Sequence, residues 1–329
     1  MQNKPVIDIH CHGAGIGAGN SGCRVAKRLQ KSWKFRYYLK AFGVTLEQLV
    51  REGDMLVMRC LSEQLTASLS VDKAVIFALD GVMDSQGRLD KRRTELFIPD
   101  TFIEQACGKY PNLLFGASIN PWRRNALECL DKAAASGAVL LKWLPSIQGI
   151  DPAHPDLIPF YRRMAELRMP LLSHTGEEAS FTKADNSLAD PERLRLPLEQ
   201  GVTVIAAHCA SNGRNAGQHN FDRFLGLMQC YENFHGDISA LTQINRLGQL
   251  QRVLRYPEWY GRLHYGTDMP LPRTGLTSPW FQLGRLPFST IRRLAALSNP
   301  WDQDLQLKLA LGLPPQVLHN TAQLLCLKS

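Results

Sequence analysis

The segment that decides the fold is PVIDIHCH at residues 5–12, a short apolar run that carries Asp8, His10 and His12 at every second position. Side chains alternate between the two faces of a β-strand, so this spacing predicts that all three point into the same interior. Similar short apolar runs recur along the chain, as strands buried on both faces do. We expect eight strands, at residues 5–12, 73–80, 112–120, 138–145, 170–176, 203–211, 234–240 and 263–270.

Segments with helical spacing of apolar residues separate most of these strands. They lie at residues 96–109, 123–136, 155–168, 191–200, 217–229 and 245–255. Eight strands that alternate with helices predict the α/β class and a (β/α)8 TIM barrel. The alternative is a doubly wound open sheet, but the glycine-rich segment at residues 13–19 lacks the helix and the downstream acid that its nucleotide-binding turn needs.

The chain has no linker that would divide it, so we expect a single TIM-barrel domain over residues 1–329. Two parts go beyond a minimal barrel. The first strand-to-helix connection, residues 13–43, is a long loop insertion that becomes basic and aromatic. Residues 276–329 are expected to be a C-terminal helical extension.

Composition narrows the class of protein only slightly. Apolar residues make up 44% and charged residues 21% of the chain, which excludes a disordered or fibrous protein. The net charge of +8 suits a nucleic-acid binder or an enzyme for acidic substrates, so charge alone does not decide. Eight scattered cysteines without a C-x-x-C pair, no apolar signal core and no membrane-length apolar run predict a cytoplasmic protein.

Metal-binding residue types stand at the carboxyl ends of five predicted strands, where barrel enzymes place their catalytic groups. A single buried histidine is usually a core residue, but five strands with a matching end indicate one site. The end residues are His10 and His12, Lys142, His174, His208 and Asp268. The positions two residues earlier on the later four strands are small or apolar, as a packed barrel interior requires: Leu140, Leu172, Ala206 and Gly266.

These segments resemble the amidohydrolase superfamily, most closely its amidohydrolase-2 group, which also contains decarboxylases and lactonases. The resemblance rests on DIHCH at residues 8–12 and on LLKWLP, LLSHTG, IAAHCAS and YGTDMP around Lys142, His174, His208 and Asp268, with VLHNTAQLL at residues 317–325. It covers the whole chain in order. The matching motifs are specific for the superfamily but give little information about the substrate.

The resemblance implies a divalent metal centre. His10, His12 and Asp268 would bind one ion. His174 and His208 would bind a second, or His174 would join the first while His208 acts as acid or base. Lys142 matches the lysine that is carboxylated in two-metal members. In a one-metal site it would stay cationic and bind a substrate carboxylate. These ligands suit Zn²⁺, and Asp268 would serve as general acid and base.

Further residues are candidates for supporting roles. Asp8 and Asp237 are candidate acceptors that fix the histidine tautomers. Arg214 and Arg273 follow two of the site residues and either form an anion-binding rim or belong to a solvated basic face. Glu177 and Glu178 follow His174 and either contact substrate or lie exposed. The insertion aromatics either cover the pocket or pack the insertion on the barrel: Trp33, Phe35, Tyr37 and Tyr38.

The expected function is metal-dependent hydrolysis of a small amide, ester or lactone, with an anionic substrate as one candidate. A non-oxidative decarboxylase of the same group is the first alternative. A phosphoesterase or TatD-type deoxyribonuclease is a weaker one, because Lys142 stands where that family's acidic ligand is expected. A non-catalytic metal-binding protein is the last. The expected partner is a small molecule, not nucleic acid or a membrane, and a homo-oligomer remains open.

Overall fold

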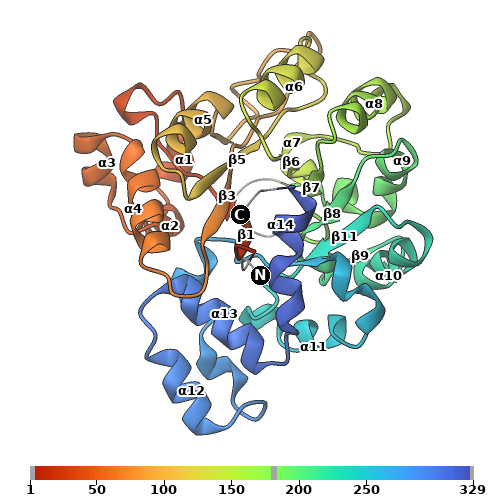
Figure 1. Cartoon of the computed structure of the whole chain (residues 1–329). Helices are drawn as coiled ribbons and strands as arrows, with labels where there is room; N and C mark the ends of the chain where they lie inside the picture. The colour runs from red at the N-terminus through yellow and green to blue at the C-terminus, as the bar shows by residue number, and fades with distance from the viewer. Residues whose placement is uncertain (1–3, 179–183, 327–329) are drawn as a thin grey trace.

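Eight parallel strands form one nearly closed barrel surrounded by helices in a computed structural model that describes residues 4–178 and 184–326 (Figure 1). The order of the strands in the sheet follows the sequence, which confirms the TIM barrel and is inconsistent with a doubly wound sheet. The strands are β1 (Ile7–His12), β3 (Lys73–Phe77), β5 (Leu113–Ala117), β6 (Leu140–Trp143), β7 (Leu171–Ser173), β8 (Val204–Ala206), β11 (Phe234–Asp237) and β12 (Leu263–His264).

The barrel closes between β1 and the segment that follows β12. The Ile9 amide donates to the Tyr265 carbonyl at 3.0 Å, and the Asp268 amide donates to the His10 carbonyl at 2.8 Å. The His12 amide donates to the Met269 carbonyl at 3.1 Å. These bonds bring the histidines of the first strand beside the aspartate that follows the last strand.

The outer face of the barrel is covered by helices whose apolar sides pack on the strands. In α10, for example, Phe221, Phe224 and Leu227 are buried. The principal outer helices are α4 (Met55–Thr66), α5 (Asp100–Lys109), α6 (Ala126–Ala135), α8 (Ile158–Glu166), α9 (Arg195–Glu199), α10 (Asn220–Cys230) and α11 (Gln249–Val253). The helix predicted at residues 96–109 begins only after Pro99, because β4 (Leu96–Phe97) pairs with β2 (Arg24–Val25).

The insertion at residues 13–43 was expected to be a loop, and this is wrong for its second half. It contains α1 (Lys27–Gln30) and α2 (Trp33–Ala41), and α3 (Leu46–Glu52) follows it. Helix α2 begins where the Ser32 hydroxyl accepts a hydrogen bond from the Lys34 amide. The Tyr37 hydroxyl donates to the Thr274 carbonyl, so α2 is fastened to the loop beyond β12.

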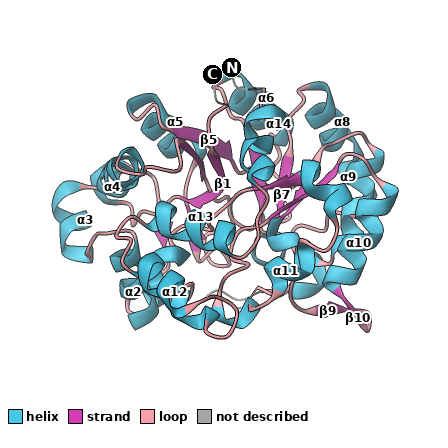
Figure 2. Ribbon diagram, turned by 60° about the horizontal axis from the view of Figure 1, so that its bottom comes forward, coloured by secondary structure: helices cyan, strands magenta, loops and turns pink. Residues whose placement is uncertain are grey.

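The C-terminal part is helical as predicted, with α12 (Phe288–Ala295), α13 (Pro300–Ala310) and α14 (Asn320–Leu324). Residues 327–329 of the predicted extension lie outside the described residues. Ala322 of α14 packs on the inner core beside Ile7 and Leu140, at the end of the barrel where both termini lie. Helices α2 and α12 lie toward the opposite end (Figure 2). That the whole chain is one domain stays a prediction.

Two strand ends depart from simple alternation. Leu140 and Leu172 face the interior as predicted, but Ala206 packs toward the helices while Ile205 and Ala207 face inward. The pairing of β1 with β3 shifts register between Asp8 and Cys11. This bulge turns both Ile9 and His10 toward the interior.

The prediction that Asp8 points into the barrel with His10 and His12 is therefore wrong. Its carboxylate faces the helical layer, where it accepts a hydrogen bond from the indole nitrogen of Trp301 in α13 at 2.8 Å. Among the described residues, no helix is long and apolar enough to cross a membrane.

Candidate metal centre

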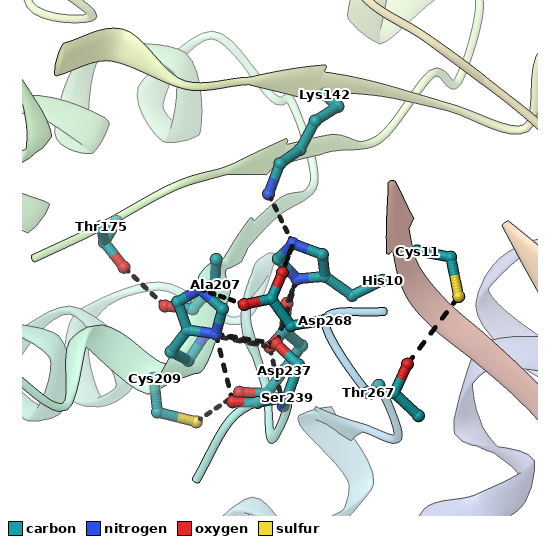
Figure 3. A network of polar contacts seen from close by, with 12 residues as sticks. His10, Cys11, Lys142, Thr175, Ala207, Cys209, Asp237, Ser239, Thr267 and Asp268 are labelled. Carbon is teal, nitrogen blue, oxygen red and sulfur yellow. Dashed lines mark hydrogen bonds and ion pairs between the residues drawn. The ribbon is translucent and has the colours of Figure 1, made fainter. Parts of the chain in front are cut away.

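All six residues predicted at the strand ends lie at one end of the barrel, and several of them appear together in Figure 3. His10 and His12 end β1, Lys142 lies in β6, and His174 follows β7. His208 and Asp268 lie just beyond β8 and β12. Both have left-handed backbone conformations, with φ of 56° and 61°. The structure thus brings together every side chain in the predicted ligand set.

His10, His12 and Asp268 form the tightest group of potential ligands. Oδ1 of Asp268 lies 3.0 Å from Nε2 of His12 and 3.5 Å from Nε2 of His10. The three ligand atoms lie within 4.8 Å of one another. With metal–ligand bonds of about 2.0–2.2 Å, neighbouring ligand atoms are roughly 3–4 Å apart, so the spacing suits one shared cation.

Lys142 is completely buried, and its Nζ lies 3.0 Å from Nε2 of His10. Burial lowers the pKa of the Lys142 ammonium to about 8. Carboxylation requires the neutral amine, so this shift leaves more of the reactive form at neutral pH. The same side chain, when protonated, is a buried cation that faces the predicted ligands.

His174 and His208 lie on the other side of the cluster, with ring centres 5.3 Å apart. Nδ1 of His208 donates to the Ser239 carbonyl at 3.1 Å, which leaves Nε2 as an acceptor 3.8 Å from Asp268 Oδ2. Nε2 of His174 is buried and has no hydrogen-bond partner among the described residues. Burial lowers the pKa of His174 to about 4 and that of His208 well below its usual value, so both rings are neutral.

Asp237 orients this group from beneath. Its Oδ2 accepts from Nδ1 of His10 at 2.8 Å, and its Oδ1 accepts from the backbone amides of His208 and Ser239 at 2.9 and 3.0 Å. Burial opposes ionisation of Asp237, but His10 and its hydrogen bond outweigh it and hold the pKa of this carboxyl far below its usual range. The geometry supports the prediction that Asp237 fixes a histidine tautomer and directs Nε2 of His10 toward Lys142 and Asp268.

Asp8, the other predicted acceptor, does not reach an imidazole. It accepts from the backbone amide of His10 at 3.0 Å and from that of Thr267 at 3.0 Å. Its role is to hold β1 against the segment after β12. Ser239, which the sequence reasoning missed, lies between the two rings: its Oγ is 3.1 Å from His10 Nδ1 and 2.8 Å from His208 Nδ1.

A cavity of about 270 Å³ opens above the cluster. His12, His174, His208 and Asp268 lie at its floor, and its walls are largely apolar. Helix α2 contributes Phe35, Tyr38 and Leu39 to the wall, whereas Trp33 is 72% exposed. The insertion aromatics therefore divide between lining the cavity and facing solvent. Glu177 and Glu178 also line the cavity.

The predicted anion-binding arginines lie elsewhere. Arg214 is exposed in the hairpin of β9 (Arg214–Asn215) and β10 (Gln218–His219), where it donates to the Gly217 carbonyl at 2.7 Å. Arg273 is also exposed, and neither side chain lines the cavity. The arginine in the cavity wall is Arg246, which the sequence reasoning missed because TQINRLG at residues 242–248 matches no motif.

A TIM barrel with a histidine and aspartate cluster at the carboxyl ends of its strands defines a class of metal-dependent enzymes. The sequence profile of the amidohydrolase family matches residues 70–320, more than half of the chain. The chain therefore belongs to the amidohydrolase family, in its amidohydrolase-2 group. A search of curated proteins finds no match.

Similar solved structures share the fold at low sequence identity. A probable 2-pyrone-4,6-dicarboxylic acid hydrolase from Acinetobacter baumannii is 14% identical, with 98% of this chain and 100% of that chain covered and a TM-score of 0.57. An uncharacterised TIM-barrel protein from Bordetella bronchiseptica is 16% identical (92% and 99% covered, TM-score 0.55). A 5-carboxyvanillate decarboxylase from Sphingomonas paucimobilis is 10% identical (99% and 100% covered, TM-score 0.51). Hydrolases and decarboxylases thus occur on closely similar folds.

Proposed function

We propose that the chain is a metal-dependent hydrolase that acts on a small amide, ester or lactone. The observation that carries the proposal is the convergence of His10, His12 and Asp268 within 4.8 Å, with His12 and Asp268 lining the cavity. Imidazole and carboxylate groups this close together are the donor set that a divalent ion such as Zn²⁺ takes.

A second observation fits the same assignment. Nε2 of His174 is buried without a hydrogen bond among the described residues, and the nearby Glu178 carboxylate oxygen lies at 3.6 Å, so a bound ligand would satisfy this atom better. A divalent ion held by these residues would lower the pKa of a water molecule to about 7 and polarise the substrate's carbonyl group.

The chain's own residues supply the proton transfers. Asp268 accepts the proton of the attacking water and returns it to the leaving group, because its carboxylate lines the cavity and faces three imidazoles. His208 is the alternative acid or base, since its Nε2 faces Asp268 while Nδ1 is fixed by Ser239. The apolar wall limits the access of bulk water to the reacting group.

Lys142 decides the number of ions. In carboxylated form it would bridge two ions, with His174 and His208 completing the second site. In cationic form it would leave one ion and contact a substrate carboxylate. We favour two ions, because Lys142 lies beside His10 at 3.0 Å and faces the same space as the remaining histidines.

Non-oxidative decarboxylation is the second candidate. It is favoured by the buried cation at Lys142, which suits a carboxylate on the substrate if it is not itself carboxylated. The partner we propose is a small organic molecule, and the location we propose is the cytoplasm.

Metal content tests these proposals directly. Protein is expressed with bicarbonate and its bound metal is measured by plasma mass spectrometry. About two ions per chain would support a carboxylated Lys142 and hydrolysis; about one would make decarboxylation an equal contender. No metal after reconstitution would contradict the site.

A matched pair of variants locates the metal. His174→Ala is expected to reduce bound metal and to abolish turnover of amide, lactone and ester test substrates. His154→Ala, which removes a histidine that is 41% exposed and does not line the cavity, should change neither. Full metal content and full activity in His174→Ala would exclude His174 from the site.

A further inference from the structure

Arg246 is a buried cation in the wall of the metal-site cavity with unfilled hydrogen-bonding capacity. Its side chain is 6% exposed, and its Nε and Nη1 atoms have no hydrogen-bond partner among the described residues. No described carboxylate forms an ion pair with it. A guanidinium has five N–H donors in a planar fork, so leaving two of its nitrogens dry and unbonded is unfavourable unless a ligand occupies them.

Hydrogen bonds fix the backbone around Arg246, so the position of its side chain is set by an ordered loop. The short helix η6 (Ile244–Arg246) follows β11, and the Arg246 amide donates to the Gln243 carbonyl at 2.8 Å. The Ile244 amide donates to the Leu276 carbonyl at 2.9 Å, which ties this loop to the segment beyond the last strand.

The charge of Arg246 acts mainly on the His174 and His208 side of the site. It is among the charges that lower the pKa of both rings, after burial itself. Helix α2 contributes the apolar side chains of Phe35 and Leu39 to the wall of the same cavity. A ligand in the cavity thus meets both a cation and apolar side chains.

Charge balance favours a ligand with one negative charge. Asp237, Asp268 and Glu178 are the carboxylates that act on both Arg246 and Lys142. Counting these five groups alone, with neutral histidines and no metal ion, gives one net negative charge. One divalent ion changes this to one net positive charge. Two ions with a carboxylated Lys142 give the same value. A monocarboxylate would neutralise either form.

We propose that Arg246 is the specificity-determining residue that binds the carboxylate of the substrate, and that the substrate carries this carboxylate on an apolar body. This inference rests on the proposed function, since it assigns one end of the same cavity. It replaces Arg214 and Arg273 as the anion contact, because those side chains are exposed outside the cavity.

Binding of benzoate and of its uncharged isostere benzamide tests the proposal by calorimetry on the metal-loaded protein. The wild type is expected to bind benzoate at least tenfold more tightly than benzamide. Arg246→Met should weaken benzoate roughly 10- to 100-fold and leave benzamide unchanged, because hydrogen bonds to a charged group are lost. Arg255→Met, at an exposed arginine of the following loop, is the control and should behave as wild type.

Several outcomes would overturn the proposal. One is a preference for benzoate that survives in Arg246→Met, and another is a preference lost in Arg214→Met or Arg273→Met instead. No measurable benzoate binding to the wild type would also contradict it. Tighter binding of phenyl phosphate than of benzoate would overturn the carboxylate assignment and make phosphate the preferred anion. Repeating the titration on metal-depleted protein separates Arg246 from the metal, because a carboxylate held by the ion alone would lose its advantage there.

Thermal unfolding supplies a second readout. Without ligand, Arg246→Met should melt at or above the wild-type temperature, because an unpaired buried charge is removed. A lower melting temperature would mean that Arg246 stabilises the fold instead. Failure of the proposed function can be told apart from failure of the Arg246 assignment. The first would appear as a protein that binds no metal, whatever the benzoate titration shows.

Discussion

At the scale of single residues, the site depends on backbone conformations that the chain adopts only under constraint. His208, Cys209 and Ala210 all have positive φ, of 56°, 48° and 47°. Each such conformation costs roughly 1–2 kcal/mol for a residue with a Cβ atom. Asp237 compensates on both sides, since its side chain binds the His208 amide and its carbonyl accepts from the Cys209 thiol at 3.1 Å. The turn directs the His208 imidazole toward the interior. Simple strand alternation would place it on the outer face with Ala206.

The first prediction concerns Asp237→Asn. If the amide nitrogen takes the place of Oδ2, it meets Nδ1–H of His10 as a second donor and disfavours the tautomer that presents Nε2. We expect metal affinity to fall roughly 10- to 100-fold, measured by competition with a chromogenic chelator. Asp222→Asn changes an exposed carboxylate and should have no effect. Unchanged affinity in Asp237→Asn would show that this hydrogen bond does not matter for the metal.

A second prediction concerns Gly266→Ala. A Cβ atom at residue 266 would lie 3.0 Å from the His10 Cβ and 3.1 Å from the Ser239 Cβ, both part of the buried site. We expect the free energy of unfolding to drop by about 1–3 kcal/mol from overpacking, with less bound metal, as urea denaturation and mass spectrometry would measure. Gly261→Ala, in the same segment, has nothing within 4 Å and should be tolerated. Equal effects of the two variants would refute the steric explanation.

At the scale of elements, β1 is shaped by its partners as much as by its own sequence. The bulge that separates Asp8 from His10 is held by hydrogen bonds from Thr267, after β12, and from Trp301, in α13. The strand therefore serves two layers: Asp8 faces the helices and His10 the interior. Simple alternation could not predict this, because both partners lie more than 250 residues further along the chain.

A third prediction follows for Trp301→Phe. The ring keeps most of its packing, but the buried Asp8 carboxylate loses the indole donor at 2.8 Å. We expect a loss of about 1–3 kcal/mol in the free energy of unfolding, measured in urea, with the metal-to-protein ratio unchanged. Trp280→Phe alters a tryptophan that is exposed and should cost much less. A stable Trp301→Phe protein would mean that the remaining donors, from His10, Cys11 and Thr267, secure Asp8 without the indole.

At the scale of the whole molecule, buried histidines outside the site make stability depend on pH. His235 and His264 lie on neighbouring strands with Nδ1 and Nε2 2.9 Å apart, and His264 also contacts Thr321 of α14. Burial lowers the pKa of His235 to about 4 and that of His264 to about 3. In the unfolded chain both titrate near 6.5. Between these values the unfolded chain binds more protons, so stability falls as the pH falls below about 6.5.

The fourth prediction is the size of this effect. Between pH 7.5 and 5.0, His264 alone should reduce the free energy of unfolding by about 2 kcal/mol. His264→Gln should therefore lessen the pH dependence by about that amount, as urea denaturation at the two pH values would measure. His154→Gln removes an exposed histidine and should leave the dependence as it is. An unaltered dependence in His264→Gln would show that this ring is protonated in the fold.

The fold and the ligand set could be predicted because they depend on local patterns. Short apolar runs marked all eight strands, and the residues that end them, such as His174 and Lys142, stand next to recognisable segments. Asp8 and Ala206 were assigned to the wrong face, because a bulge and a left-handed turn reset the alternation. Arg246 could not be found, because its burial depends on a loop held by Leu276, and no pattern in the sequence around it records that contact.

The closure of the barrel between its first and last strands has a consequence for how the protein is made. His12 and Asp268 are 256 residues apart in the chain, yet both contribute to the same proposed site. On the ribosome, His12 emerges 256 residues before Asp268, so the histidine waits for its carboxylate partner through the synthesis of the whole barrel. A divalent ion held by all three ligands could therefore be loaded only after synthesis has passed the eighth strand, and once bound it would join the first strand of the barrel to the segment after the last.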